Sequence, residues 1–72
     1  MHELDIIEFS LRLKRAMSDM HYTAENLSDA TDIPVASIRN WTRGHNLPRL
    51  DLVVKMADAL HVSIDWLCSM RV

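Results

Sequence analysis

Arginine residues gather in one part of the chain that contains no acidic residue. The stretch 33–50 holds Arg39, Arg43 and Arg49 together with His45, and all ten Asp and Glu residues lie outside it. Guanidinium groups bind phosphate through charge-assisted, often bidentate hydrogen bonds. The formal net charge of the chain is −2, but exposed charges are screened beyond about 8–10 Å, so a local basic surface can still attract a polyanion. The stretch therefore predicts contact with nucleic-acid phosphates.

Other residue patterns that could support chemistry are weak. The chain has four histidines, at His2, His21, His45 and His61, and none of them pairs with another at i, i+4 spacing. His61 and Cys68 form one candidate pair, but two ligands do not make a zinc site. The serines and Cys68 lie in no nucleophile motif. We therefore expect no metal, no cofactor and no enzymatic activity.

Length and composition also restrict the class of protein. The chain has 72 residues, of which 49% are hydrophobic and 25% charged, so we expect residues 1–72 to form a single small domain. A domain of this size buries only roughly 60% of its extended surface and has little room for a deep active-site cleft. No apolar run approaches the roughly 18 residues that a membrane span needs. The acidic first ten residues do not resemble a signal peptide, and a single cysteine suits a reducing compartment. These features predict a cytoplasmic protein with no membrane partner.

The elements that must position the arginines are short helices. With one glycine and two prolines, the chain has few of the residues that form hairpin turns. Its apolar residues recur at intervals of three and four, which is typical of helices. We expect helices over about 5–20, 24–31, 34–43 and 50–60, and a last one from Ile64 toward Met70. The apolar faces are expected to contain Ile6, Phe9, Leu13, Ala16 or Met17, Met20, Leu27, Ala30, Ile38, Trp41, Leu50, Val53, Met56, Ala57, Leu60 and Leu67. The predicted fold is an all-α, compact five-helix domain.

Local signals define the second and third of these helices. Thr23 is a suitable N-cap, but position 26 is Asn rather than Glu or Gln, so we expect an incomplete capping box. Pro34 suits the start of the third helix, and Gly44 suits a left-handed cap after its end. Only about three residues separate the two helices, which is typical of a helix-turn-helix. In that motif one helix crosses the DNA backbone and the next enters the major groove.

Residues 9–68 resemble the lambda-repressor-like helix-turn-helix domains, the Cro and repressor-type regulators of phages and bacteria. The matching residues are Arg12-Leu13-Lys14, Thr23, Leu27, Ile33, Ser37-Ile38, Trp41, Arg43-Gly44, Pro48, Ala57, Leu60 and Val62-Ser63-Ile64-Asp65-Trp66-Leu67. The resemblance implies a DNA-binding transcriptional regulator, expected to be a dimeric repressor of a palindromic operator on double-stranded DNA. Several positions differ from the family pattern: Asp32 stands where members often have glycine, and Ala24 replaces a glutamine that contacts phosphate in many members. Ser28 replaces a usual alanine, and Met17 and Thr42 replace an arginine and a glutamate that pair in many members.

The resemblance also assigns candidate contacts with DNA. The positions that similar proteins direct at bases correspond to Pro34, Val35, Ala36, Arg39 and Asn40. Val35 and Ala36 suit a thymine methyl, Asn40 suits adenine, and Arg39 suits guanine or a phosphate. The DNA-backbone candidates are Thr23, Ser37, Arg43, His45, Asn46 and Arg49.

Three residues near the C-terminal end, Trp66, Met70 and Val72, have no obvious place in the predicted core. One interpretation is that Trp66 folds back over the edge of the core. The other, which we favour, is a homodimer contact, because related domains pair through this region and one recognition helix specifies few bases. Half-sites would then lie about 34 Å apart.

Two further alternatives stay open at this stage. A second basic cluster of Arg12, Lys14 and Arg15 forms either a solvated face or additional phosphate contacts. The chain could also be a protein-interaction module on the same fold, such as an antitoxin or antirepressor with a protein partner. Ala24, the apolar Val35-Ala36 pair and the net charge of −2 favour this alternative slightly.

Overall fold

Short amphipathic helices account for most of the chain, as the spacing of its apolar residues predicts. The computed structural model describes residues 5–68. Within this range the helices are α1 (Ile6–Asp19), α2 (Ala24–Thr31), α3 (Val35–Thr42), α4 (Leu50–Leu60) and α5 (Ile64–Leu67), and the same residues contain no strand. The five-helix, all-α architecture is confirmed. The predicted extension of the last helix to Met70 lies outside the described residues.

The core lies where the inner faces of the helices meet. Its fully buried large side chains are Phe9, Leu13, Leu27, Ile33, Ile38, Met56 and Leu67. Two predicted core residues are wrong. Leu50 is 69% exposed because it opens α4, beyond the edge of the core that Val53 enters. Ala30 is exposed as well, and α2 instead buries Thr31, whose hydroxyl donates to the Leu27 carbonyl at 2.7 Å.

Side-chain caps fix the starts of the first two helices. Asp5 caps α1 by accepting a hydrogen bond from the backbone N–H of Ile7 at 2.8 Å. Thr23 caps α2 by accepting from the N–H of Asn26 at 3.0 Å, and the Asn26 side chain accepts in return from the N–H of Thr23 at 3.0 Å. The prediction of an incomplete capping box is therefore wrong, because an amide oxygen supplies the acceptor that Glu or Gln usually provides.

The turn between α2 and α3 depends on a left-handed backbone at Asp32. This residue has φ 60°, a conformation that Asp tolerates better than most residues, so it can occupy a position often given to glycine. The Ser28 hydroxyl donates to the Ile33 carbonyl across the same turn. Gly44, at φ 75°, takes the left-handed position predicted for it after the end of α3. The turn thus sets α3 at an angle to α2.

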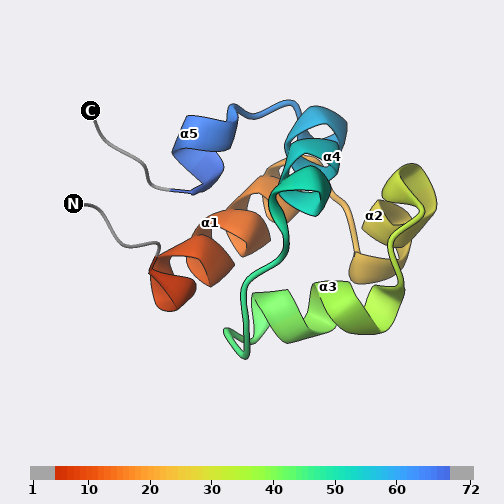
Figure 1. Ribbon diagram of the computed structural model, residues 1–72. Coiled ribbons are helices and arrows are strands. Elements are labelled where there is room, and N and C mark those ends of the chain that lie inside the picture. Colours follow the sequence, from red (N-terminus) through yellow and green to blue (C-terminus); the bar gives the residue numbers. More distant parts are fainter. Residues whose placement is uncertain (1–4, 69–72) are drawn as a thin grey trace.

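The helices place α3 and α5 on opposite sides of the domain (Figure 1). In this view α3 runs along the lower edge, and α5 lies at the upper left near the described end of the chain. α3 packs against α2 and α1, whereas α5 packs against α1 and α4. A ligand bound on the outer face of α3 would therefore leave the surface around α5 free.

Candidate nucleic-acid interface

The outer face of α3 carries the predicted base-contacting residues. Ile38 and Trp41 are buried in the core, as predicted, and anchor the opposite face of the helix. Ala36 and Arg39 are exposed, whereas Val35 and Asn40 are half-buried. The four predicted base contacts thus occupy a helix whose orientation is fixed by its buried side.

The segment after α3 extends this surface. The predicted backbone contacts Arg43, His45, Asn46 and Arg49 are all exposed. Backbone hydrogen bonds hold the start of the segment against α3, from the N–H of His45 to the Asn40 carbonyl at 3.0 Å and from the N–H of Gly44 to the Trp41 carbonyl at 3.2 Å. Most of the predicted backbone contacts therefore follow α3 directly, and Ser37 is half-buried on α3 itself.

Thr23 lies apart from these residues, at the start of α2. Its side chain is exposed, and its hydroxyl oxygen already accepts the capping hydrogen bond from Asn26. The hydroxyl proton remains available to donate to a phosphate oxygen. The helix N-terminus beside it adds a partial positive charge that suits an anion.

The arginines of stretch 33–50 differ in their charge environment. Arg39 forms an ion pair with Glu25 of α2. The Nε atom of Arg49 lies 3.4 Å from a carboxylate oxygen of Asp51. Among the described residues Arg43 has no ion-pair partner. Sequence reasoning missed both pairs because their carboxylates come from outside the stretch, one of them from a different helix.

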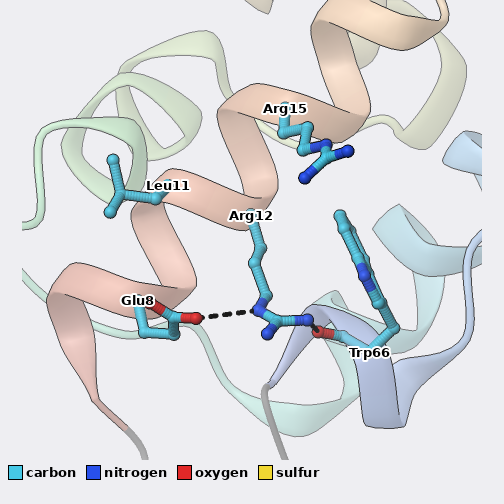
Figure 2. Close-up of a pocket in the computed structure, with 5 residues that line it drawn as sticks. All are labelled: Glu8, Leu11, Arg12, Arg15 and Trp66. Carbon is cyan, nitrogen blue, oxygen red and sulfur yellow. Dashed lines mark hydrogen bonds and ion pairs between the residues drawn. The ribbon is translucent and has the colours of Figure 1, made fainter.

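Arg12 does not belong to this surface, because it joins α1 to α5 (Figure 2). Its Nη1 donates to the Trp66 carbonyl at 2.9 Å, and its Nε lies 3.1 Å from a carboxylate oxygen of Glu8. Its guanidinium also lies 5.2 Å from the centroid of the Trp66 ring, within range of a cation–π interaction. With a side chain only 22% exposed, Arg12 is a structural link between two helices. Lys14 and Arg15 of the same cluster are exposed.

A shallow cleft surrounds the side chain of Trp66. Trp66 is half-buried and packs against the edge of the core, which agrees with the interpretation that it folds back. The cleft is lined by Glu8, Leu11, Arg12, Arg15 and Trp66. Leu11 is an apolar side chain that is 52% exposed there. Met70 and Val72, the other two predicted dimer contacts, lie outside the described residues.

Within residues 5–68, the potential metal ligands form no cluster of three or more, and the single cysteine is buried. Burial together with the charge of Asp65 raises the pKa of the Cys68 thiol, which keeps it in the unreactive protonated form. None of the helices in residues 5–68 has the length and apolar character needed to cross a membrane.

Comparison with known proteins identifies the family. A family model described as helix-turn-helix matches residues 11–67, which include all five helices except the first turns of α1. The chain belongs to this helix-turn-helix family. The model of the family thus covers the α2–turn–α3 unit from which the candidate interface is built.

A curated relative and a solved structure are similar to this helix-turn-helix chain. It is 35% identical over 57 residues to the cryptic phage CTXphi transcriptional repressor RstR of Vibrio cholerae serotype O1, a match over 79% of this chain and 51% of the repressor. The chain thus spans about half the length of that relative. Its structure resembles the restriction-modification controller protein C.AhdI from Aeromonas hydrophila, with a TM-score of 0.82, 22% identity, and coverage of 90% and 98% of the two chains. The latter match shows a shared fold.

The comparisons support a general class of activity. The helix-turn-helix match and the similarity to a phage transcriptional repressor support a DNA-binding transcriptional regulator. Regulators of this class bind double-stranded DNA and are not enzymes.

Proposed function

We propose that this chain is a sequence-specific regulator, a dimeric repressor that inserts α3 into the major groove of a palindromic operator. The observation that carries the proposal is the anchoring of α3 by Ile38 and Trp41, which leaves Ala36 and Arg39 on its outer face. A helix fits the major groove, where each base pair has a distinct pattern of donors, acceptors and methyl groups.

Each base contact follows from the chemistry of its side chain. Val35 and Ala36 offer apolar contact with a thymine methyl, and Asn40 offers an amide that matches adenine. Arg39 offers a planar fork that matches guanine. The expected backbone contacts are Thr23, Ser37, Arg43, His45, Asn46 and Arg49. These residues would hold the helix in register without carrying sequence information themselves.

The dimer is proposed to form through the cleft around Trp66. This cleft combines the half-buried ring of Trp66 with the charged side chains of Arg12 and Arg15, and Leu11 lies exposed at its edge. Aromatic residues and arginine are both enriched at protein interfaces. Because α5 and α3 lie on opposite sides of the domain (Figure 1), pairing there leaves α3 accessible to DNA.

The dependence of affinity on salt tests this proposal. A dimer that neutralises about six to ten phosphates should lose roughly 10³–10⁵ in affinity between about 50 and 200 mM salt. Replacing Arg43 with Ala should weaken binding to all sequences and reduce the salt slope by about 1 for each protomer. Lys55→Ala is the matched control, because it removes one exposed positive charge from α4, outside stretch 33–50. Equal losses from the two variants would contradict the proposed interface.

A protein-interaction module on the same fold, such as an antitoxin or antirepressor, is the second candidate. The ion pairs of Arg39 with Glu25 and of Arg49 with Asp51 favour it, because they neutralise two of the positive charges offered to DNA. Such a module would bind a protein partner with a weak dependence on salt. The titration described above therefore separates the two candidates.

A further inference from the structure

The ion pair between Arg39 and Glu25 joins the two helices of the helix-turn-helix. Nη2 of Arg39 on α3 donates to a carboxylate oxygen of Glu25 on α2, 14 residues earlier in the chain. Both side chains are exposed, by 44% for Arg39 and 61% for Glu25. Exposed ion pairs contribute little to the stability of a fold. The stability of the domain is therefore a poor explanation for this contact.

The pair restricts the side chain that is proposed to recognise guanine. An arginine fork has five N–H donors, and the contact with Glu25 engages the Nη2 group, so donors remain for a base edge. A long side chain that is already restrained has less conformational entropy left to lose when it contacts a base. Glu25 therefore reduces the entropic cost of placing Arg39 for base recognition.

The carboxylate has a second effect that does not depend on sequence. Glu25 adds a negative charge next to the surface that DNA phosphates would approach, and like charges oppose association. It also competes with phosphates for the guanidinium of Arg39. Non-specific binding depends almost entirely on such phosphate contacts, so Glu25 should weaken it more than it weakens binding to a matching operator.

We propose that Glu25 is a specificity-determining positioning residue, whose carboxylate holds Arg39 for a base edge and opposes its use as a general phosphate contact. The proposal rests on the function proposed above, because it requires α3 to recognise DNA. The restraint of Arg39 favours operator DNA alone, whereas the negative charge weakens non-operator binding more than operator binding. Glu25 therefore increases the ratio of specific to non-specific affinity.

The test compares Glu25→Gln and Glu25→Ala with Asp29→Asn. Asp29 is an exposed acid one turn further along α2, and it has no ion-pair partner among the described residues, so its variant removes the same charge without touching Arg39. Affinities for the selected operator and for an unrelated duplex are measured at one salt concentration, together with melting temperatures. Both Glu25 variants should bind the unrelated duplex more tightly, and their affinity ratio should fall about fivefold or more, the lower bound for one bidentate base contact.

A double-mutant comparison identifies the residue through which Glu25 acts. In an Arg39→Ala background, Glu25→Ala should no longer change base preference, and both single variants should lose preference at the same base position. The inference is overturned if the Glu25 variants change the ratio no more than Asp29→Asn does. It is also overturned if they lower only the melting temperature. A wild-type protein that binds both duplexes equally would instead contradict the proposed function itself.

Discussion

At the scale of single residues, the arginines of the candidate interface are expected to contribute differently to DNA binding. Among the described residues Arg43 has no carboxylate partner, so it can contact phosphate without breaking an existing ion pair. Arg39 and Arg49 must exchange a carboxylate for a new partner, or keep it while contacting DNA. The stretch without acidic residues could be recognised in the sequence. The pairing of Arg39 with Glu25 could not, because it depends on the angle between two helices.

Asn40 is expected to specify one base pair. Its amide can donate to and accept from adenine, and a good bidentate contact of this kind contributes roughly 1–3 kcal/mol of discrimination. Asn40→Ala should therefore relax the preference at one position of the operator, as measured by binding to a panel of single-base variants. Asn46→Ala is the matched control, because the same substitution in the exposed loop should weaken all sequences alike. A uniform loss for Asn40→Ala would make Asn40 a backbone contact.

At the scale of the elements, the order and type of the helices could be predicted from apolar spacing and from a few caps. The errors lie at helix ends and edges, where the period does not show how far the core reaches. Leu50 has the spacing of the buried residues of α4 but lies beyond the core. In α2, Thr31 is buried and Ala30 is exposed. Asn26 completes a capping box through a geometry that residue type alone did not indicate.

The end of α4 contains backbone strain that a substitution can relieve. His61 closes α4 with φ 58° and ψ 40°, a left-handed conformation that costs a residue with a Cβ roughly 1–2 kcal/mol and glycine almost nothing. Glycine also gives the unfolded chain more conformational entropy, which lowers the free energy of unfolding by about 0.4–1 kcal/mol and offsets part of the relief of strain. We expect His61→Gly to increase the free energy of unfolding by about 0.5–1 kcal/mol in a urea titration. His61→Ala retains the strained conformation, so its free energy of unfolding should not increase. Equal free energies of unfolding for His61→Gly and His61→Ala would contradict this explanation.

At the scale of the whole molecule, the candidate interface on α3 is separate from the cleft around Trp66. The outer face of α3 and the loop after it form one surface, and the link between Arg12 and Trp66 positions α5 on the other side (Figure 1). The sequence indicated that Trp66 was unusual but left its role open. The link to Arg12 spans 54 residues of sequence and follows from no local pattern.

Disruption of the cleft is expected to separate the proposed dimer. Leu11→Glu replaces an exposed apolar side chain at the edge of the cleft with a charged one, and Trp66→Ala removes the aromatic ring that lines the cleft. Both variants should sediment as monomers and bind the operator more weakly. Val54→Glu is the control, because Val54 is an exposed apolar residue of α4 that does not line the cleft. A wild-type oligomeric state and unchanged DNA affinity in both cleft variants would exclude this surface as the dimer contact.

Recognition of a specific palindrome by two copies of α3 in a dimer underlies the proposed function. Selection of bound duplexes from a random library by the purified protein tests it most directly. We expect enrichment of an inverted repeat whose half-sites lie about one helical turn apart, about 34 Å along the DNA. Weak binding without any enriched sequence would contradict recognition of a palindrome by a dimer and would favour a module that binds another protein.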